Sequence, residues 1–361
     1  MTPAVAVAGG REARIRALAA TLGFEPVGIT RLGPAATYPA FEHWLERGFA
    51  GEMTYLPRGT GKRHDTSLPF PAARSAVVVA LDYGGKQPAG PIARYARGAD
   101  YHDVMLERLD ILHSDIEREL GRAVAAKAYV DTGPILERDL AQRAGLGWIG
   151  KNTNLINPGL GSFFFLGALL LDLDLEPDAP FEVDRCGTCT RCLDACPTDA
   201  FVEPRVLDAT RCISYLTIEH RSEIAPELRP LMGDLVYGCD ICQDVCPWNH
   251  RFAREMPDPG LAARPENVAP HPRELLALTE EQFRQRFSGT PVTRAKRRGL
   301  ARNAAIALGN RRDPNDIPAL AAALVDPEPL VRTHVEWALE QFDAEAARLA
   351  LASRPPTGET K

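Results

Sequence analysis

The sequence CGTCTRCLDACP, residues 186–197, decides how this chain is organised, together with CDICQDVCP, residues 239–247. These two stretches contain seven of the eight cysteines in the 361-residue chain, and Cys212 lies between them. No cysteine precedes Cys186 and none follows Cys246. The thiols therefore gather in one central region, where we expect them to act together.

The spacing of the first stretch, C-x2-C-x2-C-x3-C-P, is that of bacterial ferredoxins with two [4Fe–4S] clusters, in which the fourth cysteine binds the other cluster. The second stretch lacks one thiol of the usual four, and Cys212 is the only cysteine left to supply it. Crossing the ligands as the motif demands predicts two cysteine sets. The first set is Cys186, Cys189, Cys192 and Cys246, and the second set is Cys196, Cys212, Cys239 and Cys242. Two alternatives remain open: a pair of zinc sites, because C-x2-C pairs also bind zinc, and clusters with a purely structural role.

Composition and charge are those of a soluble globular protein, with 45% hydrophobic residues and a formal net charge of −6. The N-terminus has no basic segment ahead of an apolar run, so it does not read as a signal peptide. The longest apolar stretch, Phe163 to Leu171, is shorter than the roughly 20 residues that a membrane helix needs. We therefore expect a cytoplasmic protein without a membrane partner, in which reduced thiols bind metal. The sequence shows no obvious dimer helix, which favours a monomer.

The chain divides into three predicted domains, residues 1–184, 185–255 and 270–353. In the first domain, the runs Ser75 to Leu81 and Ala125 to Val130 are typical of strands. Apolar residues at helical spacing between Asp100 and Leu120 predict a helix. Strands that alternate with helices predict an α/β domain, within a chain of the α+β class.

The third domain contains a repeated helical pattern. Leu300 and Arg302 recur as Leu330 and Arg332 in a similar context. Paired short helices with this period predict a small HEAT-like array, and the alternative is a plain helical tail.

A basic stretch overlaps the start of this pattern. From Gln282 to Arg312 the chain has nine basic residues and no acidic one. Phosphate backbones attract such stretches, although a run of charges is usually only a solvated face. In an otherwise acidic protein, the stretch predicts a local site for nucleic acid.

Asp131 is the main candidate for chemistry in the first domain. It ends a predicted strand, where reactive groups often lie, and apolar neighbours such as Ile135 predict a carboxyl group that burial keeps protonated as a general acid. The pattern alone favours a simpler interpretation, in which Asp131 caps the helix that Pro134 begins.

A second polar group is ARYARGADYH, residues 93–102, which combines aromatic and cationic side chains. The simpler interpretation is a solvated helix start with Asp100 at the N-cap. Asp100 and His102 also match part of a D-x-H-x-x-G signature of some cobalamin proteins. Met105 stands where that signature has glycine, so we treat the match as coincidence.

Long stretches of the chain resemble the cobalamin-dependent epoxyqueuosine reductases. They are VDTGPILERDLAQRAGLGWIGKNTNLI (residues 130–156), the first cysteine stretch, YGCDICQDVCPWN (237–249) and RAKRRGLARNAAIALGN (294–310). The resemblance covers about residues 10–345 in the order of the family. It implies an N-terminal cobalamin-binding domain, a ferredoxin-like domain with two [4Fe–4S] clusters and a C-terminal helical domain.

The resemblance also implies an activity, the last step of queuosine synthesis at the wobble position of a tRNA anticodon. An epoxide on a cyclopentane ring loses its oxygen as water and becomes an alkene, which consumes two electrons and two protons. In the family, a cobalamin reduced through the two clusters does this. An unidentified electron donor and tRNA are the implied partners.

The site residues follow from the same resemblance. The proton donor of the family corresponds to Asp131, which overturns the capping interpretation. The implied corrin contacts are Tyr95, Arg97, Asn152, Ser162 and Ser214. The basic residues implied to hold the anticodon stem are Arg294, Lys296, Arg297, Arg298 and Arg302.

Three rival functions stay open at the level of sequence. A corrinoid reductive dehalogenase would usually carry a twin-arginine export signal, and this N-terminus has none. A ferredoxin-type electron carrier would leave the large first domain unexplained. A tRNA-binding scaffold with structural clusters would not need Asp131.

Overall fold

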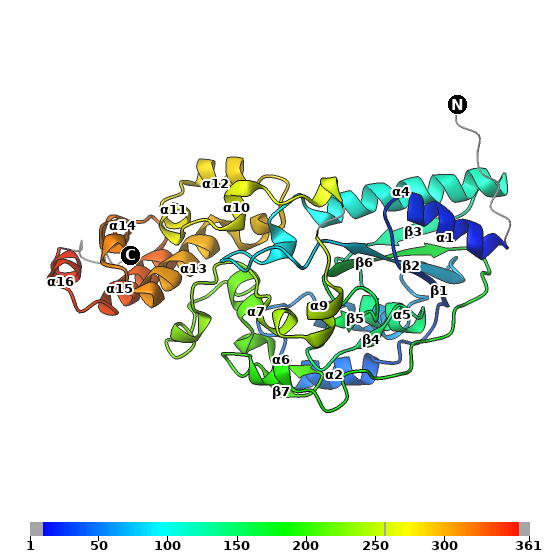
Figure 1. The fold of residues 1–361 in the computed structure, drawn as a ribbon, viewed down its shortest axis with the longest axis horizontal. Coiled ribbons are helices and arrows are strands. Elements are labelled where there is room, and N and C mark those ends of the chain that lie inside the picture. The colour runs from blue at the N-terminus through cyan, green and yellow to red at the C-terminus, as the bar shows by residue number, and fades with distance from the viewer. Residues whose placement is uncertain (1–9, 256–257, 354–361) are drawn as a thin grey trace.

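The computed structural model describes residues 10–255 and 258–353. A four-stranded sheet lies at one end of an elongated molecule, helices form the other end, and the cysteine region lies between them (Figure 1). The sheet has the order β1-β2-β6-β3, and every neighbouring pair is antiparallel. Its strands are β1 (Val27–Arg31), β2 (Ser75–Asp82), β6 (Phe164–Leu171) and β3 (Ala126–Tyr129). The predicted strands are confirmed, but the antiparallel pairing corrects the expected α/β domain, because α/β sheets are mostly parallel.

Both faces of the sheet are buried because β2 and β6 are apolar at nearly every position. Val77 and Val79 point into one core, which α1 (Arg11–Thr21) and α4 (Tyr101–Leu120) cover. The alternate residues, such as Val78, point into a second core beneath α5 (Glu137–Arg143). This alternation explains why a continuous apolar run, rather than an apolar–polar alternation, marks these strands.

The ends of α4 follow from its sequence. The Asp100 side chain caps the first turn by accepting from the His102 amide, and Gly121 ends the helix in a left-handed conformation. The predicted helix and its N-cap are therefore confirmed. In contrast, α5 begins at Glu137 with Leu136 at its N-cap, so the prediction that Pro134 begins this helix is wrong, and Asp131 caps nothing.

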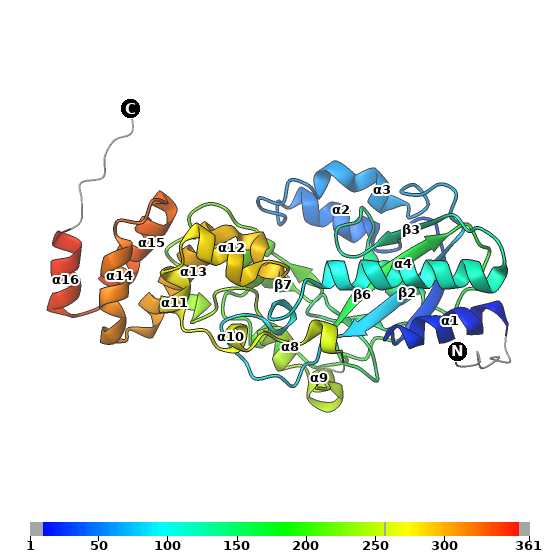
Figure 2. The ribbon, with the colours of Figure 1, turned by 90° about the horizontal axis from the view of Figure 1, so that it is seen from above.

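The segment between β1 and β2 forms a flap on one side of the sheet (Figure 2). It contains α2 (Tyr38–Glu46), the short 3-10 helix η1 (Pro57–Gly59) and α3 (Thr60–His64). The loop between these helices reaches the cysteine region, where the amide of Glu52 donates to the Tyr215 hydroxyl at 2.7 Å.

The cysteine region consists of short helices and small hairpins. Its helices are α6 (Arg191–Asp194), α7 (Ile213–Ile218), α8 (Ile241–Asp244) and α9 (Pro247–Phe252). Its strands pair as β4 (Trp148–Ile149) with β5 (Leu155–Ile156), and β7 (Phe201–Glu203) with β8 (Val206–Leu207). The helices α6 and α8, which contain Cys192 and Cys242, pack against each other.

The C-terminal part is entirely helical within residues 258–353. Its α-helices are α10 (Pro265–Val268), α11 (Pro272–Leu276), α12 (Glu280–Phe287), α13 (Lys296–Arg311), α14 (Ile317–Ala323), α15 (Pro329–Glu340) and α16 (Glu345–Ala352). The recurring Leu300 and Leu330 lie on α13 and α15, which pack against each other. The core of this part also includes Ile92 and Tyr237, so it is continuous with the rest of the molecule.

Across the described ranges, no helix combines the length and the apolar character that crossing a membrane requires.

Candidate functional site

The structure brings the cysteines together in the predicted sets. Burial and then the like charges of Cys186, Cys246 and Cys189 raise the pKa of Cys192 to about 11. All of these thiols belong to the first set. Burial also raises the pKa of Cys246, with Cys186 and Cys189 as its charged neighbours. Thiols gathered this closely are costly to ionise unless a cationic group binds them as thiolates.

The second set is gathered in the same way. Burial, and then the charges of Cys212 and Cys196, raise the pKa of Cys239 to about 12. Burial raises the pKa of Cys242 further, with Cys239, Cys212 and the first-set residue Cys192 as charged neighbours. The electrostatic interaction of Cys192 with Cys242 and the packing of α6 against α8 place the two sets near each other, as a path for single electrons requires.

The arrangement favours clusters over the zinc alternative. In the described part of the chain, no three His, Cys, Asp or Glu side chains converge closely enough to hold a single metal ion. A zinc site requires four ligands within about 2.3 Å of one ion, whereas the cysteines around an iron–sulfur cube each bind a different iron and lie farther apart. All eight cysteines are free thiols.

The two sets differ in their distance from the surface. Gly187 and Thr188, between Cys186 and Cys189 of the first set, are exposed. Asp240, between Cys239 and Cys242 of the second set, is buried. The first set is therefore the one that an external electron donor reaches more easily.

Asp131 lies two residues beyond the end of β3 with a φ of 56°, a left-handed conformation that Asp tolerates better than most residues. The side chain of Asp131 is 67% exposed to solvent, although protein atoms surround the carboxyl group on most sides. This combination is typical of a residue at the bottom of a cleft. The His102 Nε2 atom lies 3.4 Å from its Oδ2 atom. The Tyr101 hydroxyl also donates to the carboxylate.

These contacts decide the charge of Asp131. Burial raises the pKa of Asp131, but the hydrogen bonds from His102 and Tyr101 and the charge of His102 more than offset it, so the pKa is lowered. The expectation that burial keeps this carboxyl group protonated is therefore wrong. Nearby, burial and then the charge of Asp131 raise the pKa of Glu137 to about 8. Glu137 Oε1 is buried and has no hydrogen-bond partner among the described residues.

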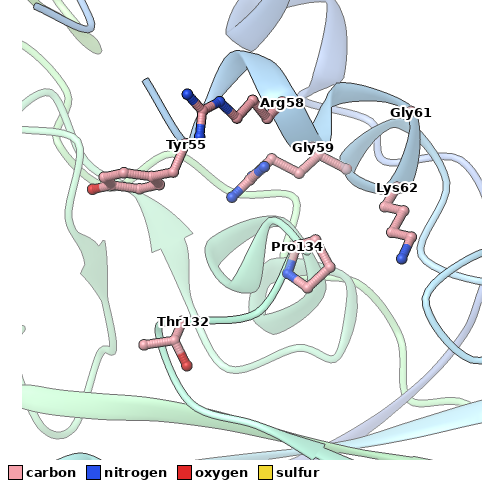
Figure 3. Close-up of a pocket in the computed structure, with 8 residues that line it drawn as sticks. Tyr55, Arg58, Gly59, Gly61, Lys62, Thr132 and Pro134 are labelled. Atoms are coloured by element: carbon pink, nitrogen blue, oxygen red, sulfur yellow. The ribbon is translucent and has the colours of Figure 1, made fainter. Parts of the chain in front are cut away.

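A cavity of about 510 Å³ is lined in part by Thr132, the residue that follows Asp131 (Figure 3). Tyr55, Arg58 and Lys62 come from the flap, and Thr132 and Pro134 come from the loop that follows Asp131. We call this cavity, together with Asp131, the Asp131 cleft. Its lining combines an exposed aromatic ring with cationic side chains, which suits a nucleobase and its phosphates.

Comparisons with known proteins identify the family. Residues 63–132 match a family model described as epoxyqueuosine reductase QueG, DUF1730. The chain is 43% identical over 333 residues to the epoxyqueuosine reductase of Pseudomonas aeruginosa, covering 89% of this chain and 91% of that protein. The chain belongs to the epoxyqueuosine reductase family. Residues 185–249 match the model of a 4Fe-4S double cluster binding domain, which confirms the prediction of two clusters. The assignment of individual cysteines stays a prediction.

Solved structures of the family have the same fold. An epoxyqueuosine reductase in complex with an epoxyqueuosine-modified tRNA-Tyr stem loop is 31% identical, with a TM-score of 0.81, covering 94% of this chain and 96% of that chain. The enzyme from Bacillus subtilis, with the catalytic loop of an aspartate swung out of the active site, is 30% identical, with a TM-score of 0.80 and coverage of 94% and 97%.

Three of the corrin contacts implied by the family resemblance have buried side chains that the protein itself uses. Arg97 is fully buried and donates to the carbonyls of Ile92 and Pro88. Asn152 donates to the carbonyl of Cys242 at 3.4 Å. Asn152 thus links the first domain to the cysteine region, whereas Arg97 bonds within its own domain and leaves its buried Nη2 atom without a partner among the described residues. The corrin contacts of both residues stay a prediction.

Ser162 is the third of these residues. Its side chain is buried and receives hydrogen bonds from Gln243 and Asn249 of the cysteine region. It joins the segment just before β6 to α8 and α9, and its corrin contact stays a prediction.

Tyr95 and Ser214 are placed differently. Tyr95 is half-buried and forms a hydrogen bond with the Tyr237 hydroxyl. Its ring lies close to Gly238, the residue before Cys239, because a Cβ atom built at Gly238 would be 3.4 Å from the ring. The charge of Asp131 is one of the causes that raise the pKa of Tyr95, after burial and its tyrosine neighbours. The backbone amide of Ser214 donates to the Cys212 sulfur. Both residues lie beside the second cysteine set, and their corrin contacts stay a prediction.

Two of the predicted tRNA contacts are in the interior. The guanidinium group of Arg302 is fully buried and donates to the carbonyls of Leu216, His220 and Ser222 and to Asn303 Oδ1. Arg297 forms a buried ion pair with Asp326. Neither side chain is available to a phosphate, so these two predictions are wrong.

The other three basic residues are exposed. Arg294 pairs with both oxygens of Glu219 and lies over the Tyr55 ring at 5.7 Å. Lys296 and Arg298 follow on α13. The ring of Tyr55 therefore connects the Asp131 cleft to the exposed side of the basic stretch.

Sequence reasoning missed several groups of the cleft. Tyr55, Arg58 and Lys62 carry no motif and reach the cleft only through the fold of the flap. His102 was visible in the sequence, but its distance of 29 positions from Asp131 concealed their contact. The strand that ends near Asp131 and the N-cap at Asp100 were the only local signals for this pair.

Proposed function

We propose that this chain is an epoxyqueuosine reductase that converts epoxyqueuosine in tRNA to queuosine. The observation that carries the proposal is the position of Asp131, which opens into a cleft beside the second cysteine set. Family membership over most of the chain supports the same activity. A solved family member holds an epoxyqueuosine-modified tRNA stem loop, which names the substrate to test here.

The first cysteine set would hold the cluster that accepts electrons from a donor, and the second set would hold the cluster that passes them toward the cleft. The exposed loop around Cys186 and Cys189 suits docking of an electron donor. The second set lies near the cleft, because Tyr95 packs between the loop of Cys239 and the surroundings of Asp131. Replacing Cys212 with Ser is therefore expected to remove half of the iron, because only the second cluster loses a ligand. A full iron content in that variant would contradict the assignment.

The residues around Asp131 fit a large polar cofactor, which the family resemblance implies to be cobalamin. The buried, unpartnered oxygen of Glu137 and the open carboxylate of Asp131 are polar groups that a bound cofactor would contact. Tyr95 and Ser214 would lie on the side of the second cluster. When bound, reduced cobalamin supplies a strongly reducing cobalt centre that delivers two electrons to the epoxide.

Asp131 serves as the proton donor at the ring oxygen, which leaves easily only when it is protonated. The carboxylate is ionised in the resting structure, so a proton must reach it before the oxygen departs. Tyr101, which bonds to the carboxylate, and the left-handed backbone at Asp131 orient the group toward the cleft. The swung-out aspartate loop of the Bacillus subtilis enzyme indicates that such a loop moves in that protein.

The anticodon stem binds on the exposed side of the basic stretch. Arg294, Lys296 and Arg298 contact its phosphates, and the cationic residues Arg58 and Lys62 continue this surface across the cleft. The helices α13 to α16 form the HEAT-like unit that presents this surface. In this proposal the protein acts as a monomer in the cytoplasm. Its three domains are residues 1–184, 185–255 and 270–353.

The test begins with anaerobically purified protein. We expect a broad cluster absorption band that dithionite bleaches, and added cobalamin that stays with the protein through desalting. The loaded protein is then incubated with reductant and an epoxyqueuosine-bearing stem loop, and the nucleosides are measured by mass spectrometry. Queuosine that appears only with cobalamin supports the proposal. Cluster bands without retained cobalamin and without queuosine would instead favour a ferredoxin-type electron carrier.

A further inference from the structure

His102 lies in a line between two carboxylates. Its Nδ1 atom is 2.6 Å from Asp100 Oδ1, and its Nε2 atom is 3.4 Å from Asp131 Oδ2. The ring stacks on Tyr101 with a centroid distance of 4.0 Å, and the His102 amide donates to Asp100 at the start of α4. The ring is thus held on both edges and on one face, with Nε2 directed at Asp131.

This geometry determines where the proton resides. A neutral imidazole donates from only one nitrogen, whereas an imidazolium donates from both and satisfies both carboxylates. Burial lowers the pKa of His102, but the hydrogen bonds to Asp100 and Asp131 raise it to about 9. The pKa of Asp131 is lowered by the same contact. At neutral pH the pair therefore consists of a protonated His102 and an ionised Asp131.

Other charged and titratable groups near the pair do not reverse this assignment. On α5, the charge of Arg138 helps to lower the pKa of Asp131, while Glu137 has a pKa raised to about 8. Tyr101, on α4 beside His102, has its pKa raised and stays a neutral donor. Glu137 also carries a proton at neutral pH, but it interacts with Asp131 through charge, whereas His102 directs Nε2 at the Asp131 carboxylate from 3.4 Å.

We propose that His102 is the proton store of the reaction, passing the proton on Nε2 to the Asp131 carboxylate, which delivers it to the departing oxygen. The inference rests on the proposed function. Reduction of the epoxide to an alkene and water takes two electrons and two protons. The reduced cofactors of the proposed function would supply the electrons, His102 supplies the first proton through Asp131, and solvent water supplies the second proton to the departing hydroxide. Neutral His102 then recovers its proton from water, which reaches it because its side chain is 25% exposed. His102 acts through Asp131 and positions and charges that group without touching the substrate.

Asp100→Asn is the most informative variant. Asparagine caps helices as well as aspartate does, so α4 keeps its N-terminus. The negative charge beside Nδ1 is lost, which should lower the pKa of His102 and leave the ring in place. A merely structural role of the Asp100–His102 contact predicts no change in the pH dependence of turnover. A proton store predicts that the alkaline limb of the kcat profile shifts to lower pH by about one unit or more.

The direct measurement is an NMR titration of the histidine ring signals in the full chain with both clusters oxidised and cobalamin absent. His102→Gln assigns the resonance, and His334, whose pKa burial lowers to about 3, provides an internal reference that does not titrate above pH 5. We expect His102 to titrate near pH 9 in the wild type and at clearly lower pH in Asp100→Asn and Asp131→Asn. In the loaded enzyme, His102→Gln should lower kcat roughly tenfold or more while KM for the stem loop changes little.

Two results would overturn the inference and keep the function: a wild-type His102 that titrates below pH 7, or superimposable kcat profiles of wild type and Asp100→Asn. A loaded wild-type enzyme that never forms queuosine would overturn the proposed function and this inference with it. The titration does not depend on turnover, so the two failures are distinguished.

Discussion

The Asp131 cleft and the junction between α7 and α13 both hold polar groups inside the molecule, but Arg302 and Asn303 at the junction have hydrogen-bond partners, whereas the cleft has a buried oxygen with none among the described residues. At the junction, every guanidinium nitrogen of Arg302 has an acceptor, and Asn303 donates to the carbonyls of Thr217 and Val236. In the cleft, Asp131 is open and Glu137 Oε1 is unpartnered among the described residues. The satisfied network stabilises the fold, whereas a buried oxygen without a partner beside an open carboxylate is typical of a ligand-binding site.

Two histidines show the same contrast. His334 at the junction contacts the Leu330 carbonyl through Nδ1 and accepts from the Ile224 amide through Nε2, which fixes a neutral ring. His102 in the cleft lies between two carboxylates, which favours the charged ring. The first histidine completes a packing interface, and the second holds a charge that chemistry can use.

The largest effect on stability is expected for Arg302→Met. The methionine fills most of the space but leaves the carbonyls of Leu216, His220 and Ser222 without their donor, which costs on the order of 3 kcal/mol. Arg298→Met, on the exposed side of the same helix, is the matched control and should change the free energy of unfolding by less than about 0.5 kcal/mol. Equal losses in denaturant unfolding of the two variants would break the comparison between closed and open regions.

The next largest effect is on the pH dependence of stability, to which His334 and His102 contribute with opposite signs. The unfolded state protonates His334 below about pH 6.5 while the folded state resists, so stability is lost as the pH falls, by about 2 kcal/mol at pH 5. The raised pKa of His102 contributes stability below about pH 6.5 that is lost as the pH rises through 9, on the order of 1–2 kcal/mol after screening. Unfolding of His334→Gln and His102→Gln across this pH range should show slopes that depart from wild type at opposite ends. Parallel slopes would contradict the assigned charges.

The smallest effect is expected on the exposed side of α13. Arg298→Met should weaken binding of the stem loop a few-fold and reduce the salt dependence of binding by about one phosphate contact. Fluorescence anisotropy at several salt concentrations measures both quantities. Glu345→Gln, on the distant α16, serves as a control for a change in net charge. An unchanged salt slope in Arg298→Met would remove this residue from the tRNA surface.

The two clusters could be predicted because short cysteine spacings are typical of them, and the strands could be predicted because β2 and β6 are continuous apolar runs. The charge of Asp131 could not, because it depends on His102 from a different element. The basic stretch shows the same limit. Arg298 and Arg302 have similar sequence surroundings. Only the packing of α13 against α7 shows that Arg298 is exposed and that Arg302 is buried with its hydrogen bonds satisfied. Local patterns predict ligand sets and strands, whereas tertiary contacts decide which polar groups remain open.

The proposed mechanism depends most directly on Asp131. The decisive measurement is a single-turnover assay that compares Asp131→Asn with wild type, both loaded with clusters and cobalamin. Asparagine tolerates the left-handed backbone of this position, so the fold should be retained. We predict that both proteins bind the stem loop and reduce their clusters equally, while formation of queuosine falls roughly 10²–10⁴-fold in the variant. Queuosine formation at the wild-type rate in Asp131→Asn would contradict the central claim that this carboxyl group protonates the departing oxygen.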